Sequence, residues 1–249
     1  MPLIDPKARQ EILEAFKKKD SSIFSKTVFI GKKPGSEGQE PRFKRNIAPE
    51  QQAKFNQEFH DAVWKDDLEG IKAALRKGAE MDVKNTEGHI ALSIASMRGN
   101  REVAKFLIDN GAEIETKDKN GATPLMHAAQ RNKEGVVELL LDNYAEVDAQ
   151  DEEGRTALMA AASECGISVI GILIDNGAKV DARDKKGRTA LLIAAENQYV
   201  DAVGLAKGLI ERGADPNAKN DAGRVPLDLA HTLKNGDMAK FMREHGAKW

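Results

Sequence analysis

The stretch Asp118-Lys119-Asn120-Gly121-Ala122-Thr123-Pro124-Leu125 decides the fold, because its pattern recurs along the chain. An aspartate and an asparagine precede a turn glycine, and Thr123 then offers a hydroxyl that can cap a helix. Pro124 suits the first helical turn, where no backbone N–H is required. The small pair Ala128-Ala129 follows, and after a polar break comes the apolar stripe Val136–Leu141. The stretch therefore predicts two short helices joined by a turn.

The same features return every 33 residues over most of the chain. One glycine series has steps of 33, 33, 33 and 36 residues, at Gly88, Gly121, Gly154, Gly187 and Gly223. A second series, each time followed by alanine, has steps of 33, 33, 33, 36 and 33 residues, at Gly78, Gly111, Tyr144, Gly177, Gly213 and Gly246. Two series with one period are typical of a repeat protein. One unit cannot bury its apolar face alone, so we predict that the units stack.

These residues resemble the ankyrin repeat. The resemblance rests on the stretch from Asp118 to Leu125, on the Ala128-Ala129 pair and on the terminal glycine-alanine, and it covers roughly residues 52–249. It implies an all-α repeat solenoid of helix–turn–helix units, joined by β-hairpin-like loops and stacked in a curved row. About six units are expected, at 52–84, 85–117, 118–150, 151–183, 184–219 and 220–249. We therefore expect an N-terminal arm at 1–48 and a repeat domain at 49–249.

Composition and charge exclude several classes of protein. The 249 residues include 41% apolar residues and 38 Lys+Arg against 40 Asp+Glu, which argues against wholesale disorder and against a surface built for polyanions. The longest apolar runs, Ala157–Ala162 and Ala190–Ala195, are six residues each, whereas a membrane span needs about 20. The first twenty residues are rich in charge, so we expect no signal peptide. The single cysteine, Cys165, fits a reducing compartment, and we expect a cytoplasmic monomer.

No pattern in the sequence indicates catalysis or a bound cofactor. The five histidines are scattered without metal-ligand spacing, so no metal site is expected. The glycine-rich segment 31–38 lacks the Gly-Lys-Ser/Thr ending that cradles phosphate. Carboxylates recur at turn and helix-surface positions, for which a solvated surface is expected. We therefore expect neither an enzyme nor a cofactor-binding protein.

Some units depart from their own pattern. Tyr144 replaces a glycine where a positive φ would cost about 1 kcal/mol; drift is the favoured explanation, and a contact of the ring is the alternative. His127 falls at a position that is apolar in other units, so we expect a buried or half-buried histidine satisfied by the backbone. Cys165 is interpreted as a turn residue. The unit 184–219 is three residues longer than the others, around Gln198–Gly204, where Tyr199 lies in slack loop or in a specific contact.

The resemblance implies binding of another protein through a concave groove. In the family, the two residues after the small pair of each first helix usually face this groove. In this chain, the pairs of the first units are aromatic, thioether-containing and cationic. The tips of the loops alternate in charge, which suits a protein surface better than a phosphate backbone. We predict these partner-binding residues: Trp64, Lys65, Met97, Arg98, Gln130, Arg131, His89, Lys119, Arg155 and Arg188. The alternative for the first of them is that the arm covers Trp64 with Phe24, Val28, Phe29 and Phe43.

The N-terminal arm differs in charge from the rest of the chain. Residues 1–50 carry 11 Lys+Arg and 7 Asp+Glu, a net charge of +4, whereas the other 199 residues carry −6. Docking of the arm on the solenoid is thus electrostatically reasonable, and the arm could occupy the groove until a partner displaces it. The alternative function is binding of nucleic acid or another anionic ligand by the arm, through Lys32, Lys33, Arg42, Lys44 and Arg45.

Overall fold

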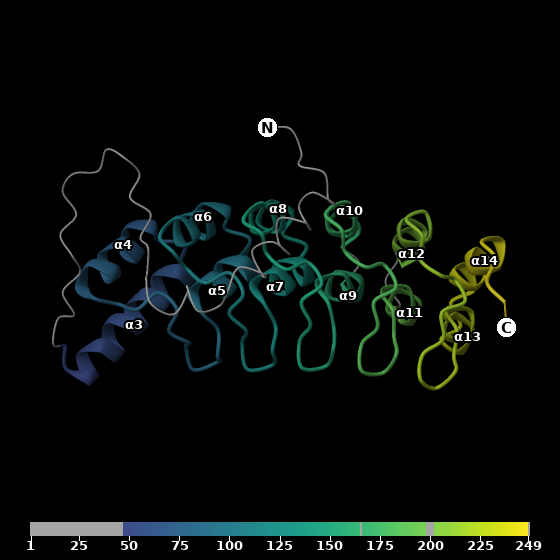
Figure 1. Ribbon diagram of the computed structural model, residues 1–249, viewed down its shortest axis with the longest axis horizontal. Helices are drawn as coiled ribbons and strands as arrows, with labels where there is room; N and C mark the ends of the chain where they lie inside the picture. Colours follow the sequence, from purple (N-terminus) through teal and green to yellow (C-terminus); the bar gives the residue numbers. More distant parts are fainter. Residues whose placement is uncertain (1–46, 165, 198–201, 249) are drawn as a thin grey trace, which may run out of the picture.

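Helices are the regular structure of the described part of this protein. The computed structural model describes residues 47–164, 166–197 and 202–248, and within these ranges there is no β-strand. No helix in the described ranges is both long and apolar enough to cross a membrane. The helices, labelled in Figure 1, are α3 (Pro49–Trp64), α4 (Leu68–Lys77), α5 (Ala91–Arg98), α6 (Arg101–Asp109), α7 (Pro124–Gln130), α8 (Glu134–Asp142), α9 (Ala157–Ser163), α10 (Ile167–Asp175), α11 (Ala190–Glu196), α12 (Ala202–Ile210), α13 (Pro226–Thr232) and α14 (Gly236–Glu244).

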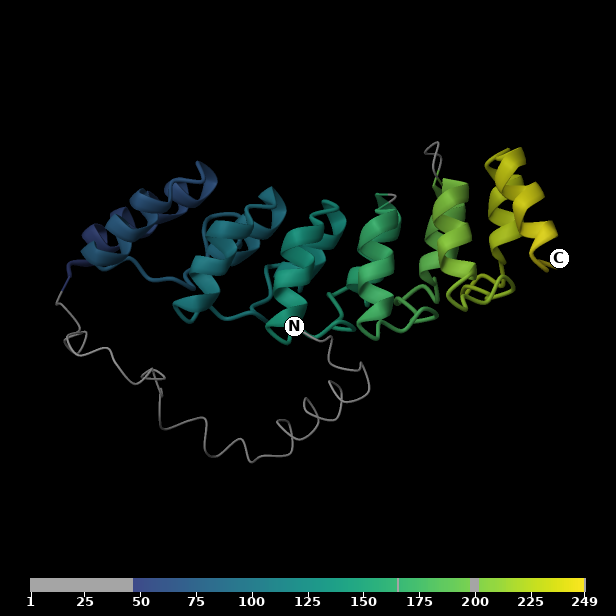
Figure 2. The same ribbon diagram turned by 90° about the horizontal axis from the view of Figure 1, so that it is seen from above.

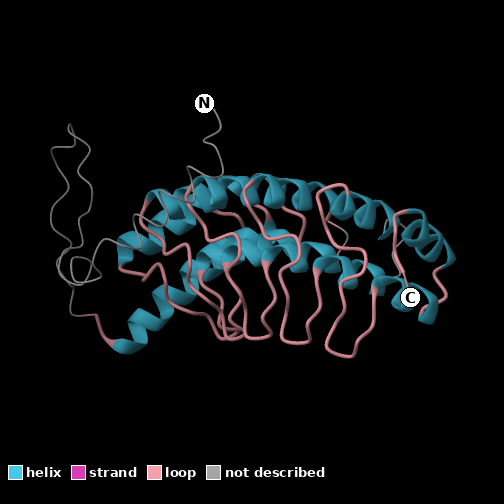
Figure 3. Ribbon diagram, turned by 45° about the vertical axis from the view of Figure 1, so that its right-hand side comes forward, coloured by secondary structure: helices cyan, strands magenta, loops and turns pink. Residues whose placement is uncertain are grey.

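The helices form consecutive pairs that stack in a gently curved row (Figure 2). The first helices of the pairs, from α3 to α13, pack against one another in one layer, and their partners form the second layer. The loops that join one pair to the next all project to the same side of the stack (Figure 3). This arrangement confirms the predicted all-α repeat solenoid. The number of units and their boundaries stay predictions.

The first helices of three neighbouring pairs begin in the predicted way. Thr123, Thr156 and Thr189 each accept a hydrogen bond from the backbone N–H three residues later, at 3.4, 3.4 and 3.3 Å. Pro124 stands in the first turn of α7, where its missing N–H costs nothing. The alanine pairs that follow are completely buried, so adjacent helices approach closely: Ala128-Ala129, Ala161-Ala162 and Ala194-Ala195.

The apolar faces of the pairs merge into one core. Buried side chains form a continuous cluster that runs from Phe59 in α3 to Met242 in α14. Burying one large aliphatic side chain contributes about 1.5–3 kcal/mol. The cluster extends across every pair of helices in the described ranges, and a small second cluster of Leu192, Ala195 and Leu229 lies between α11 and α13.

Backbone hydrogen bonds tie neighbouring loops together. Within one loop, the N–H of Asp118 donates to the carbonyl of Ala122 at 3.0 Å and closes a hairpin-like turn. Between loops, the bonds join Glu152 N to Asn120 O (2.9 Å), Lys185 N to Glu153 O (2.9 Å) and Asp221 N to Lys186 O (3.1 Å). The loops are therefore hairpin-like and in mutual contact, although the described residues contain no strand.

Tyr144 has the backbone conformation that the repeat pattern predicts. Its φ is +65°, and the glycines at the same repeat position, Gly111 and Gly177, both have a φ of +90°. A Cβ added to either glycine would meet nothing within 4 Å. The position therefore has room for a side chain, and the tyrosine is disfavoured by its backbone rather than by crowding.

Replacing Tyr144 by glycine is expected to raise the free energy of unfolding by about 1 kcal/mol, because glycine adopts a positive φ without steric penalty. Thermal and urea unfolding followed by circular dichroism measure the change. The reverse substitution, Gly111→Tyr, is the matched control and should lower stability by a similar amount. A less stable Tyr144→Gly variant would show instead that the contacts of the tyrosine side chain outweigh the cost of its backbone conformation.

Several predictions concern residues outside the described ranges. These are the five basic residues of the arm (Lys32, Lys33, Arg42, Lys44 and Arg45), its aromatic and aliphatic residues (Phe24, Val28, Phe29 and Phe43), the turn residue Cys165 and the loop residue Tyr199. Of the arm at 1–48, the described part comprises residues 47 and 48.

Candidate functional site

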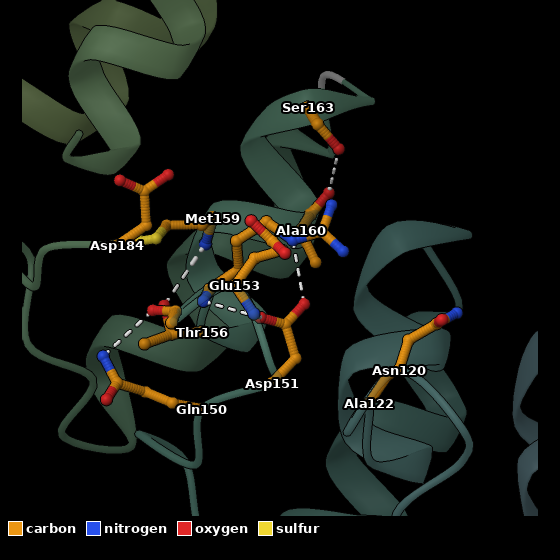
Figure 4. Close-up of polar contacts among 12 residues, drawn as sticks. Asn120, Ala122, Gln150, Asp151, Glu153, Thr156, Met159, Ala160, Ser163 and Asp184 are labelled. Carbon is orange, nitrogen blue, oxygen red and sulfur yellow. Dashed lines mark hydrogen bonds and ion pairs between the residues drawn. The ribbon is translucent and has the colours of Figure 1, made fainter. Parts of the chain in front are cut away.

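A buried aspartate organises each of two turns: Asp151 the turn before α9, and Asp184 the turn before α11. Oδ1 of Asp151 accepts the backbone N–H of Glu153 at 2.9 Å (Figure 4) and that of Arg155 at 2.8 Å. Its Oδ2 accepts Nε of Arg155 at 2.8 Å, and Asp184 holds Arg188 in the same way. The side chains of Asp151 and Asp184 are only 3% and 1% exposed. The expectation of solvated turn carboxylates was thus wrong here, because each carboxylate is paired with an arginine four residues later.

A pocket of about 170 Å³ lies between these turns and the first helices. Its lining residues share four positions of the 33-residue repeat and come from three predicted units. They are Ala122, Arg155 and Arg188; Met126 and Met159; His127, Ala160 and Ile193; and Gln130 and Ser163. The caps Asp151 and Thr156 complete the lining. The lining thus combines apolar side chains with polar and charged ones, and a concave site of this kind can accept a side chain of a partner.

The polar groups of the pocket differ in how fully they are paired. Arg188 pairs with Asp184 through Nε and Nη2 and with Glu196 through Nη1. Burial alone would lower the pKa of Arg188, but these carboxylates raise it above its ordinary value, so the residue stays charged. Arg155 is different. Its side chain is 45% exposed, and Asp151 is its sole side-chain partner in the described part of the chain. The other nitrogens of its guanidinium can therefore donate to a partner.

The helix α9 carries one side of the pocket from end to end. Figure 4 shows Asp151 and Thr156 near its first turn and Ser163 at its last. The hydroxyl of Ser163 donates to the carbonyl of Ala160 at 2.8 Å, which holds this side chain against the helix. The pocket thus has fixed polar groups at both ends and the apolar Met159 between them.

Three of the predicted binding residues meet in this pocket: Gln130, Arg155 and Arg188. Met126, Met159, Ser163 and Ile193 also line it but were not among the predicted binding residues. The signal that could have found them is the repeat itself, because each stands 33 or 66 residues from another lining residue.

At the predicted aromatic end of the groove, Trp64, Asp66 and Arg98 form a separate group of side chains, the Trp64 cluster. Trp64 is 40% exposed at the end of α3, and the Cζ of Arg98 lies 5.7 Å from the centroid of its ring. Arg98 also donates to both oxygens of Asp66, at 3.1 and 2.8 Å. These hydrogen bonds hold the pKa of Asp66 below its ordinary value and that of Arg98 above it. The arginine thus joins the ends of two first helices.

The remaining predicted binding residues do not join either group. Lys65, Lys119 and Arg131 are exposed, whereas Met97 is half-buried and packs against the core. His89 is half-buried too. They flank the pocket and the Trp64 cluster along the loop side and the first helices.

His127 does not have the backbone partner that we expected. Its Nε2 lies 3.0 Å from Oδ2 of Asp118, so a carboxylate holds the ring. Burial lowers the pKa of His127. Burial alone would raise the pKa of Asp118, but the backbone N–H groups of Ala122 and Asn120 bring it below its ordinary value. The expectation of a buried or half-buried histidine is confirmed, and the expected kind of partner was wrong.

His60 is a second buried histidine, in α3. Its Nε2 lies 3.1 Å from the carbonyl of Val83 and donates to it, and its Nδ1 is buried without a hydrogen bond in the described structure. Burial lowers the pKa of His60, although the nearby carboxylate of Asp61 acts in the opposite direction. The folded protein therefore holds this ring neutral.

Lowering the pH is expected to destabilise the protein through His60. Because its pKa is lower in the folded than in the unfolded chain, the unfolded chain takes up more protons below about pH 6.5. Its contribution is fully present above that pH and is lost as the pH falls toward the folded pKa. We expect His60→Gln, which can still donate to Val83, to lose less stability between pH 7.5 and 5.5. Urea unfolding at both pH values measures this, and equal losses in both proteins would contradict it.

The comparisons with known proteins agree with the fold. The family model described as ankyrin repeats (3 copies) matches residues 59–151, 110–184 and 158–249. The chain therefore belongs to the ankyrin repeat family. A search of curated proteins gives no match. Ankyrin repeats are generally modules for protein–protein interaction and generally not enzymes.

Proposed function

We propose that this protein is a non-enzymatic, cytoplasmic adaptor that binds a protein partner through the pocket of α7, α9 and α11 and through the adjoining loop tips. The observation that carries the proposal is the pocket itself, which combines apolar side chains with an arginine whose guanidinium has nitrogens free to donate to a partner. Its lining comes from three consecutive predicted units, so the partner would lie along the row of helices.

The pocket favours a partner segment with one apolar side chain next to a carboxylate. Met126, Met159 and Ile193 supply the apolar surface. Arg155 supplies a guanidinium, which binds a carboxylate with two parallel hydrogen bonds. Because Arg188 is already paired with two carboxylates, it serves to keep Asp184 and Glu196 neutralised rather than to bind the partner.

Selection from a random peptide library displayed on phage tests this proposal and does not require the natural partner to be identified. We expect the selected peptides to combine an acidic residue with a neighbouring apolar one. Arg155→Ala should weaken the binding of a selected peptide by about tenfold or more, since truncation of an arginine that acts as a binding hot spot costs about 2 kcal/mol or more. Lys105→Ala, on the outer helix α6, is the matched control and should leave the affinity unchanged.

The outcome that contradicts the proposal is equally specific. Peptides without acidic residues, or peptides whose affinity is the same for Arg155→Ala and for the unaltered chain, would remove the pocket as the binding site. Circular dichroism of each variant establishes that a loss of binding is not a loss of fold.

The Trp64 cluster supplies a proposed second contact for the same partner. Trp and Arg are enriched where interfaces bind most tightly, since both bury a large surface and still stack or hydrogen-bond. With a full-length partner, Trp64→Ala and Arg98→Glu should each weaken binding and leave the helix content intact. If neither variant changes the affinity, the contact is confined to the pocket.

A further inference from the structure

Two histidines and an aspartate from two neighbouring predicted units converge on one point: His89 and Asp118 lie in loops, and His127 lies in α7. Nε2 of His127 lies 3.0 Å from Oδ2 of Asp118, and Nε2 of His89 lies 3.8 Å from the same oxygen. The two imidazole rings meet edge to face, with centroids 5.3 Å apart. One ligand atom from each of the three side chains lies within 4.8 Å of the other two. The spacing of these three residues along the chain does not indicate a cluster, because the cluster forms only when the units stack.

The carboxylate of Asp118 is fixed in place by its own turn. Its Oδ1 accepts the backbone N–H groups of Asn120 at 2.8 Å and of Ala122 at 2.9 Å. Oδ2 therefore has one direction left, and it points at the two imidazoles. The side chain is only 2% exposed, so its charge cannot be balanced by bulk water.

Asp118 lacks the cation that the equivalent aspartates have. Asp151 and Asp184 are each paired with an arginine four residues later, whereas the residue four after Asp118 is Ala122. The neighbours of Asp118 are instead the imidazoles of His89 and His127, which carry no permanent positive charge. A buried carboxylate without a permanent positive partner is energetically costly. A bound cation would supply the missing charge.

We propose that His89, Asp118 and His127 bind a zinc ion, with a water molecule as the fourth ligand. Imidazole nitrogen and carboxylate oxygen are both zinc ligands, and three of them around one ion leave one open position. Ligand atoms around a tetrahedral zinc lie about 3.3 Å apart, as follows from bonds of about 2.0–2.1 Å. The observed separations of 3.0 and 3.8 Å are close to this value, and the half-buried His89 has room to adjust.

A second carboxylate lies close to His89. Oε2 of Glu87 lies 3.4 Å from Nδ1 of this histidine, on the side of the ring away from Asp118, and this Nδ1 is buried without a hydrogen bond in the described structure. A carboxylate behind a metal-bound imidazole favours the proton on the outer nitrogen and leaves the inner nitrogen for the metal. This ion would join the predicted units 85–117 and 118–150, because His89 belongs to the first and the other two ligands to the second.

Isothermal titration of the metal-free full chain with zinc chloride tests the proposal. We expect one ion per chain with a micromolar or tighter dissociation constant. Asp118→Asn should weaken binding by about tenfold or more and keep the fold, because Asn85 and Asn220 occupy the same repeat position and accept the same kind of backbone N–H groups. Asp151→Asn, one unit later and paired with Arg155, is the matched control and should bind zinc as tightly as the unaltered chain.

Two further variants keep the proposal testable if Asp118→Asn does not fold. His89→Ala removes a half-buried ligand without touching the turn, and it should also weaken binding by about tenfold or more. Ala122→Arg introduces the pairing seen at Arg155 and should compete with the ion. Zinc should raise the melting temperature of the unaltered chain and not that of these variants. No saturable binding below about 1 mM zinc, or equal affinity in the unaltered chain and His89→Ala, would overturn the proposal.

Discussion

Replacing Leu140 by alanine is expected to lower the free energy of unfolding by about 2–5 kcal/mol. Leu140 lies in α8 with none of its surface exposed, in the middle of the continuous core. Helices packed on either side hold the surroundings in place, so the space left by the removed atoms cannot collapse. Urea unfolding followed by circular dichroism measures the loss.

Met242→Ala in α14 is the matched control, because it removes a buried side chain at the end of the row of helices instead of at its centre. Met242 is equally buried but belongs to the last helix of the described chain. Because each unit of a solenoid contacts only its neighbours, this substitution should open α13 and α14 to hydrogen exchange and leave the centre protected. The expectation fails if Leu140→Ala unfolds with an unchanged midpoint, or if both variants give one and the same exchange pattern.

Gly121→Ala is expected to lower the free energy of unfolding by about 2–4 kcal/mol, since a strained backbone and a close contact act together. The φ of Gly121 is +78°, and an added Cβ would lie 2.8 Å from the backbone nitrogen of Glu152. That nitrogen donates a hydrogen bond to the carbonyl of Asn120. The next loop therefore cannot move away from the added Cβ without breaking this hydrogen bond between the loops.

The corresponding glycine at the end of the row separates the two causes. Gly223 has a similar φ of +74°, but an added Cβ would meet nothing within 4 Å. Gly223→Ala should therefore cost only the left-handed backbone term, about 1 kcal/mol. Equal losses in the two variants, measured by urea unfolding, would mean that the contact between loops contributes nothing.

The local features of this fold could be predicted from the sequence. The caps at Thr123 and Thr156, the buried alanine pairs and the positive φ of Tyr144 all depend on residues within one unit. A 33-residue period repeats each of these signals, and the repetition makes the interpretation of every single unit stronger.

The features that join units could not be predicted in the same way. The burial of Asp118, the pairing of Arg98 with Asp66 and the approach of His89 to His127 all depend on how one unit lies on the next. Spacing along the chain gives the register of such residues but not the direction of their side chains. The pocket belongs to this class too, and its members become visible only after alignment of the units.

The arginine that follows each buried turn aspartate has a consequence for the order of the units. The segments 151–183 and 184–219 each carry their own counter-ion, Arg155 and Arg188. Either segment could be duplicated or moved by recombination, and its buried aspartate would still be paired with an arginine. The segment 118–150 has no such arginine, and Oδ2 of its aspartate faces Nε2 of His89 in the preceding segment at 3.8 Å, so it cannot be moved so freely. Chimeric arrays built from this chain should therefore transplant residues 85–150 as one block.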